Sequence, residues 1–293
     1  MNKKKSRPVQ SARLPFHSLD QLTRKKKNSR LKIGLALSGG VCYGVSQIGV
    51  LKVLEKAHIA IDCLAGTSAG AIIAAAYASG LTCDQIEHLG IQTKWKDFFS
   101  FHPSRMGLVS SVAIEDYIRK YLKVEKFKDL KKPLAVVATD ICSGNEVIFT
   151  HGSLAKAVRA SCSIPGIYAP VDYAHHQLVD GGMSENVPVR ALKALGADMI
   201  IAVNVLGKRP VFELASNVFQ VLTRVWYFFV EQQETWKKNS DIQIEMNLNH
   251  YDLFDFSAAK EMISLGELET QKCMHEIQKK IYHKFYFQPE IYW

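Results

Sequence analysis

Short apolar runs that end in glycine alternate with stretches of helical periodicity along most of the chain. Residues 32–37 form one such run and residues 61–65 form another, which ends in Gly66. Buried strands of a parallel sheet read as continuous apolar runs, whereas helices repeat their apolar positions every three to four residues. The pattern therefore predicts two strands, each followed by a helix, at residues 44–56 and 71–78.

The same alternation continues to the end of the chain. Strands are predicted at residues 134–138, 146–150, 177–179, 199–205 and 242–246, and helices at 114–122, 153–160 (with Ser153 as N-cap), 188–195 and 265–281. Residues 82–130 otherwise read as short helices and loops. Strands that alternate with helices indicate an α/β fold with a mostly parallel sheet, and no internal linker divides residues 31–285.

Two stretches, residues 33–51 and 63–83, carry no formal charge and are long enough to cross a bilayer. Both contain clusters of glycine and serine, which would break a helix in hydrocarbon and expose its backbone groups. The first thirty residues lack the continuous apolar run of a signal peptide. We therefore expect neither a transmembrane helix nor a signal peptide.

The net charge of +9 comes entirely from the N-terminal segment. Residues 1–30 contain ten Lys or Arg and one Asp, whereas basic and acidic residues balance in the rest of the chain. A neutral body argues against a nucleic-acid-binding domain. The segment itself fits two descriptions, a solvated disordered leader or an electrostatic tether to an anionic membrane surface.

The six cysteines lie far apart and form no C-x-x-C pair. This spacing excludes a zinc ribbon and a disulfide framework, and it favours a reducing compartment such as the cytoplasm. No cluster of His, Asp and Glu offers a metal site, and no cofactor is expected.

The segment from Gly66 to Gly70 fits the G-x-S-x-G pattern, with Ser68 at its centre. It lies between a predicted strand and a predicted helix, as a nucleophile elbow requires. Small flanking residues allow the strained turn, and the following helix directs its N-terminal amides at the reaction centre. A structural glycine turn without chemistry is the alternative.

An earlier glycine turn runs from Gly39 to Gly44. It lacks the lysine of a P-loop, and Val41 occupies the second glycine position of a dinucleotide-binding motif. Its consecutive backbone amides suit an oxyanion hole, formed by Gly39, Gly40 and Val41. The side chain of Val41 is compatible with this role if its φ is negative.

A serine nucleophile requires a base. His250 is the one histidine whose loop context fits a conventional triad, and Asp180 is the stronger candidate because it ends a predicted strand. The glycines at 181 and 182 leave room for close approach to Ser68, although a turn aspartate that caps its own loop would look the same.

Three motifs together resemble those of the patatin-like phospholipases, especially the bacterial members. They are Ser38-Gly39-Gly40-Val41-Cys42-Tyr43-Gly44, Gly66-Thr67-Ser68-Ala69-Gly70 and Asp180-Gly181-Gly182. Further similar stretches are 138–140, 157–166, 186–189 and 253–256, so the resemblance covers about residues 31–280. It implies a three-layer α/β/α sandwich and hydrolysis of lipid acyl esters by a Ser68–Asp180 dyad without histidine or metal.

The oxyanion loop departs from the family pattern at two positions. Val41 replaces a glycine and Tyr43 replaces an Arg or Lys. The resemblance therefore leaves two alternatives, a catalytically weak relative that binds lipid or a protein partner, and an esterase of small soluble esters. The aromatic segment 211–236 is interpreted as a core helix, although it could line an acyl pocket or touch a bilayer. The C-terminal residues 286–293 form an aromatic extension.

Overall fold

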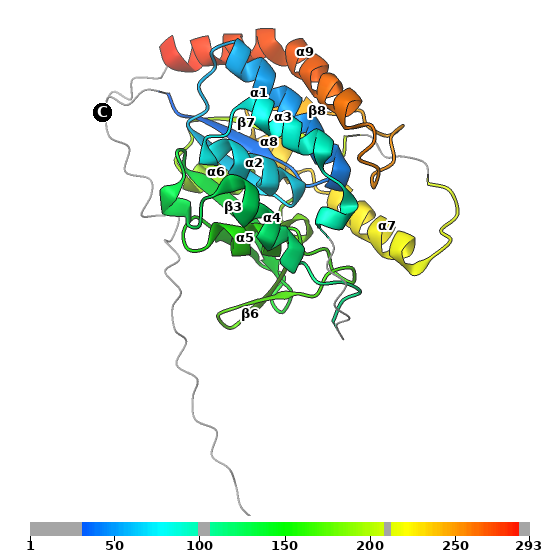
Figure 1. The fold of residues 1–293 in the computed structure, drawn as a ribbon. Coiled ribbons are helices and arrows are strands. Elements are labelled where there is room, and N and C mark those ends of the chain that lie inside the picture. The colour runs from blue at the N-terminus through cyan, green and yellow to red at the C-terminus, as the bar shows by residue number, and fades with distance from the viewer. Residues whose placement is uncertain (1–30, 99–105, 208–211, 287–293) are drawn as a thin grey trace, which may run out of the picture.

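The computed structural model describes residues 31–98, 106–207 and 212–286, and within them eight strands form one sheet (Figure 1). The order is β5-β6-β3-β2-β1-β7-β8, with β4 paired to β3. Strands β3, β2, β1, β7 and β8 pair with one another in parallel. The remaining pairs are antiparallel: β4 and β6 each pair with β3, and β5 pairs with β6. The strands are β1 (Ile33–Leu37), β2 (Cys63–Thr67), β3 (Leu134–Asp140), β4 (Glu146–Phe149), β5 (Val171–Tyr173), β6 (His176–Asp180), β7 (Met199–Asn204) and β8 (Ile242–Glu245).

Helices cover both faces of this sheet, which confirms the three-layer sandwich. Alternate residues of β1 belong to different cores: Leu35 packs with α1, α2, α5 and α9, whereas Ala36 packs with α6 and α8. The helices are α1 (Ser46–Lys56), α2 (Ala69–Ser79), α3 (Cys83–Gln92), α4 (Val112–Leu122), α5 (Leu154–Ser161), α6 (Val189–Ala194), α7 (Val218–Glu231), α8 (Thr235–Asn239) and α9 (Ala259–Tyr286). Short 3-10 turns are η2 (Val41–Val45), η3 (Trp95–Asp97), η4 (Phe127–Asp129) and η5 (Gly181–Met183).

The predicted strands and helices are present, and apart from the last helix their ends differ from the prediction by at most two residues. Ser153 caps α5 as expected, because its side chain accepts the Lys156 amide at 3.4 Å. The aromatic segment is divided between α7 and α8, and α9 extends well beyond the predicted 265–281 at both ends. The basic segment 1–30, Val211 and residues 287–293 of the C-terminal extension lie outside the described residues. Within the described part, none of the helices is both long and apolar enough to cross a membrane.

The pairing of β3 determines where the candidate site forms. Val137 pairs with both β2 and β4, and Thr139 pairs with both β4 and β6. Because a strand has only two edges, β2 and β6 must lie end to end along the edge opposite β4. Thr67 is opposite Val137 and Asp180 is opposite Ala138, the next residue of β3. The end of β2 therefore meets the end of β6.

Helices α1 and α9 pack together at unusually close range, along the top of the molecule in Figure 1. A Cβ at Gly49 of α1 would lie 2.1 Å from the Ile263 carbonyl oxygen. A Cβ at Gly266 of α9 would lie 1.9 Å from the carbonyl oxygen of Ser46. Each contact is with backbone, so neither helix can accept a side chain without moving apart from the other.

We therefore expect Gly266→Ala to lower the free energy of unfolding by about 1–3 kcal/mol, because the strain of overpacking exceeds the helix-propensity gain of alanine. Thermal unfolding measures this loss as a melting temperature lower by several degrees. Gly90→Ala is the matched control, because its Cβ would meet only the flexible end of Ile48 at 2.9 Å. Equal melting temperatures for the two variants would contradict the close packing of α1 and α9.

Candidate active site

Ser68 occupies the sharp turn between β2 and α2. Its φ of 51° and ψ of −123° are unfavourable for a residue with a side chain, so the strained elbow expected from the sequence is present. The turn is anchored by Ser161, whose hydroxyl accepts the Ser68 amide at 2.8 Å and donates to the Val137 carbonyl at 2.6 Å. Ser68 itself is 4% exposed and precedes the N-terminus of α2.

Close backbone approaches explain the glycines around this turn. A Cβ on any of the motif glycines would come within 3.0 Å of an atom of another residue, at Gly44, Gly66, Gly70, Gly181 and Gly182. At Gly70 the clash would be with the Leu37 carbonyl oxygen, at 2.2 Å. This contact presses the start of α2 against the end of β1 and positions Ser68 beside the first glycine turn.

Asp180 ends β6 and is completely buried. Its Oδ1 accepts the Gly182 amide at 2.8 Å, whereas its Oδ2 has no hydrogen-bond partner among the described residues. Burial raises the pKa of this carboxyl to about 7. The Ser68 hydroxyl, the Gly182 amide and the Trp226 indole each lower the pKa and so partly oppose that rise. Of the three, the Gly182 amide forms a hydrogen bond with the carboxylate, whereas the Ser68 and Trp226 side chains lie near it without one.

The first glycine turn lies against Ser68, but one of its amides is already in use. A Cβ at Gly39 would lie 3.0 Å from the Ser68 Cβ. The Gly39 amide donates to the Asn186 carbonyl at 3.3 Å, contrary to the prediction that it faces the reaction centre. The amides of Gly40 and Val41 have no acceptor within the described part of the chain. Two of the three predicted donors are therefore free.

Val41 adopts a left-handed backbone conformation with φ of 50°. The condition under which valine fits this loop, a negative φ, is therefore not met. A β-branched residue at positive φ is strained by roughly 1–3 kcal/mol. Val41 and Ser68 line the same cavity, so backbone strain is concentrated at this site.

Tyr43, the second departure from the expected loop pattern, anchors the loop. It is 2% exposed, and its hydroxyl donates to the Tyr251 carbonyl at 2.7 Å. The amide of Cys42 donates to the Leu253 carbonyl at 3.2 Å. These two bonds attach η2 to the loop that carries Phe254 and Phe256.

Two residues that the sequence analysis did not assign to the site connect the motifs, Gln233 through its side chain and Asn186 through its backbone. The Gln233 side chain donates to the Gly182 carbonyl at 2.7 Å and accepts the Asn186 amide at 2.9 Å. Asn186 in turn accepts the Gly39 amide through its carbonyl. The Asp-Gly-Gly turn and the glycine-rich turn are thus held by one network. Gln233 lies in a polar run whose pattern gives no sign of this role.

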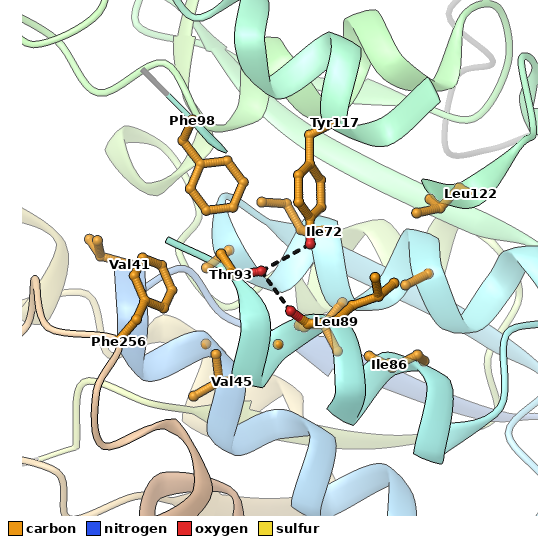
Figure 2. Close-up of a pocket in the computed structure, with 15 residues that line it drawn as sticks. Val41, Val45, Ile72, Ile86, Leu89, Thr93, Phe98, Tyr117, Leu122 and Phe256 are labelled. Carbon is orange, nitrogen blue, oxygen red and sulfur yellow. Dashed lines mark hydrogen bonds between the residues drawn. The ribbon is translucent and has the colours of Figure 1, made fainter. Parts of the chain in front are cut away.

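Two adjoining apolar cavities open beside Ser68. The nearer, of about 430 Å³, is lined by Ser68 and by Cys162, Ile164, Tyr168 and Trp95 among others. The second, of about 560 Å³, extends between α2, α3 and α4 and shares Val41, Ala69, Ile72, Phe98 and Phe256 with the first. Figure 2 shows its one polar feature of note, the Thr93 hydroxyl at 3.0 Å from the Tyr117 hydroxyl. Neither cavity is lined by α7, against one of the interpretations of that segment.

The structure does not bring His250 to the site. Its exposed imidazole packs on Tyr251, with ring centroids 4.2 Å apart, and no hydrogen bond joins it to Ser68 or Asp180. Within the described residues no group of three or more His, Cys, Asp or Glu side chains could hold a metal ion. All six cysteines are free thiols.

Residues 35–193 match the family model of the patatin-like phospholipases. The chain is 30% identical over 200 residues to an uncharacterized NTE family protein of Mycobacterium bovis, across 67% of this chain and 55% of the relative. It is 31% identical to lysophospholipase NTE1 of Phaeosphaeria nodorum, across 68% of this chain and 13% of that protein.

The curated relatives are longer proteins, and the chain spans about half or less of their length. Among solved structures, VipD from Legionella pneumophila superposes with a TM-score of 0.60 at 14% identity, across 88% of this chain and 72% of that one. This likeness shows a shared fold. The match of the family model over more than half of the chain shows that the protein belongs to the patatin-like phospholipase family.

Proposed function

We propose that this protein hydrolyses acyl esters of lipids, with Ser68 as nucleophile and Asp180 as general base. The observation that carries this proposal is the unpartnered Oδ2 of a fully buried Asp180 beside a strained Ser68. A carboxyl with this environment has a pKa near neutrality and an oxygen free to accept a proton.

The reaction begins when Asp180 takes the proton of the Ser68 hydroxyl as its Oγ attacks the ester carbonyl. Negative charge develops on the carbonyl oxygen, where the free amides of Gly40 and Val41 and the N-terminus of α2 stabilise it. When the carbon–oxygen bond breaks, protonated Asp180 gives its proton to the leaving alcohol. A water molecule then repeats the sequence on the acyl-serine and releases the fatty acid.

The cavities support a long acyl chain as the group that is transferred. Their walls are apolar, and the larger one continues the smaller away from Ser68. Relatives named as lysophospholipases point to phospholipids or lysophospholipids as the source of that chain. An esterase confined to small soluble esters would not need a second apolar cavity beyond the one that Ser68 lines.

A weakly active relative that binds lipid or a partner is the second candidate. Two observations favour it, the strained Val41 and the engaged amide of Gly39. Contact of the basic segment 1–30 with an anionic membrane also stays a prediction, since that segment lies outside the described residues.

Ser68→Ala should abolish esterase activity and labelling by a fluorophosphonate, because the attacking oxygen is lost. Mass spectrometry of products from mixed phospholipids, compared with wild type, measures the first effect. His250→Ala is the control and should retain most activity. Residual turnover in Ser68→Ala near the wild-type rate would reject Ser68 as nucleophile.

Asp180→Asn should lower turnover by about 10²–10⁴-fold, because an amide cannot accept the serine proton. In the wild type, turnover should rise as the pH increases through about 7, where the carboxyl loses its proton.

The same substitution should change the pH dependence of stability. An acid whose pKa is higher in the folded protein than in the unfolded chain binds more protons when folded, so stability falls as the pH rises from 3.8 to about 7. Asp180→Asn removes this loss and should stabilise the protein at pH 8, with the difference fading toward pH 4. A destabilisation of equal size at both pH values, measured by thermal unfolding, would contradict a raised pKa.

Leu89→Trp should shorten the range of acyl chains that the enzyme accepts. Leu89 is half-buried in α3 and lines the larger cavity only, so a tryptophan there fills space far from Ser68. The ratio kcat/KM for p-nitrophenyl esters should fall for long chains and stay constant for short ones. His88→Trp, on the exposed side of the same helix, is the matched control. An equal loss for all chain lengths would place the acyl chain elsewhere.

A further inference from the structure

Helix α7 carries apolar side chains on the face that it turns away from the protein. Val218, Val221, Val225 and Phe229 are 65%, 48%, 63% and 51% exposed, and we call them the α7 stripe. Their spacing of three or four residues puts them on one line along the helix. An exposed helix of a globular protein normally places polar residues on that line.

The opposite face of α7 is also apolar. Trp226, Tyr227 and Val230 are nearly or fully buried against the body of the protein. The charged Arg224 does not cover the stripe, because its guanidinium lies over the Phe212 ring and bonds to the Glu213 carbonyl. A helix that is apolar on two faces is suited to contact with a second apolar phase.

The α7 stripe lies at the side of the cavity that contains Ser68. A Cβ at Gly166 would lie 3.1 Å from the Leu222 side chain of α7, and Gly166 stands between Ile164 and Tyr168, which line that cavity. Figure 1 shows α7 at the outer edge of the molecule.

A second exposed apolar group continues from this point. The Val109 amide donates to the Ile167 carbonyl at 2.9 Å, and the Ala169 amide donates back to Val109 at 3.3 Å. On either side of Val109, Leu108 and Val112 are 49% and 40% exposed. Apolar side chains from α7 and from the start of α4 thus flank the same loop at the cavity.

We propose that the α7 stripe is a lipid-docking surface that inserts into the acyl region of a membrane and places the cavity at the lipid boundary. The inference rests on the proposed function, because it takes the cavity to receive an acyl chain from that surface. A lipid surface fits the position of the stripe, since Leu222 of the same helix packs beside Gly166, in the loop that lines the cavity with Ile164 and Tyr168. Amphipathic helices bind membranes in this manner through buried apolar area.

The binding is apolar, so it differs from the electrostatic attraction expected of the basic segment. Salt screens interactions between exposed charges but does not weaken apolar burial. Docking through α7 should therefore persist on uncharged lipid at high salt, where a tether made of Lys and Arg would release.

The test measures binding to vesicles of zwitterionic phosphatidylcholine in 0.5 M NaCl, with the full chain carrying Ser68→Ala so that no lipid is consumed. Adding Val225→Glu and Phe229→Glu should weaken partitioning at least tenfold. Leu268→Glu is the matched control, because Leu268 is 47% exposed on α9, far from the stripe in sequence, and should bind as before.

A second measurement reports the depth of the stripe. In Val225→Trp, tryptophan emission should shift to the blue on vesicles and be quenched by brominated acyl chains, whereas Leu268→Trp should show neither effect. Turnover of a soluble short-chain ester, measured with Ser68 intact, should be the same with and without the glutamates.

Unchanged vesicle binding by the glutamate variants, or an unshifted emission of Val225→Trp, would overturn the proposal. So would a change from dimer to monomer in the glutamate variants, which would show that a second copy of the chain covers the stripe. Failure of the proposed function would look different: soluble-ester turnover would be absent while vesicle binding through α7 remained.

Discussion

The shared edge of β3 is the constraint on which the site depends. Because β2 and β6 lie end to end on that edge, the last residue of one strand meets the last residue of the other. Ser68 leaves β2 there and Asp180 ends β6 there, although 111 positions separate them in the sequence. The antiparallel strands β4, β5 and β6 look like additions to a parallel sheet, yet it is their pairing that supplies the second half of the candidate dyad.

Burial raises the pKa of Asp180, which suits it to act as a base, and it also lowers the stability of the folded site. A carboxylate in this position receives one backbone hydrogen bond, from Gly182, and its other oxygen has no hydrogen-bond partner among the described residues. The neighbouring backbone is strained at Ser68 and at Val41. Such unfavourable features persist only where the surrounding structure is strong enough to hold them, here through the close contacts of the motif glycines and the hydrogen bonds of Ser161.

The sequence predicts the parts of the site that depend on local geometry. Glycines that close a strand at Gly39 and Gly66 mark turns whatever the distant residues are, so Ser68 and its strained backbone could be foreseen. The use of the Gly39 amide depends on Asn186, which is distant in sequence. The positive φ of Val41 is not indicated by the residue types around it. The sequence does not show that α3 and α4 line a cavity, because a helix face that lines a cavity has the same apolar pattern as one that packs in the core. Gln233 acts through three-dimensional neighbours alone, so no pattern around it indicates a function.

Gln233 has a mechanical consequence. It lies two residues beyond the end of α7, and its side chain bonds to the Gly182 carbonyl and to the backbone amide of Asn186. The amide of Gly182 is the one that binds Asp180, so a rigid-body tilt of α7 must displace atoms within one residue of the buried carboxylate. The end of α7 is thus mechanically connected to the candidate base. The connection runs through two hydrogen bonds, from the Gln233 side chain to the Gly182 carbonyl and from the Gly182 amide to Asp180.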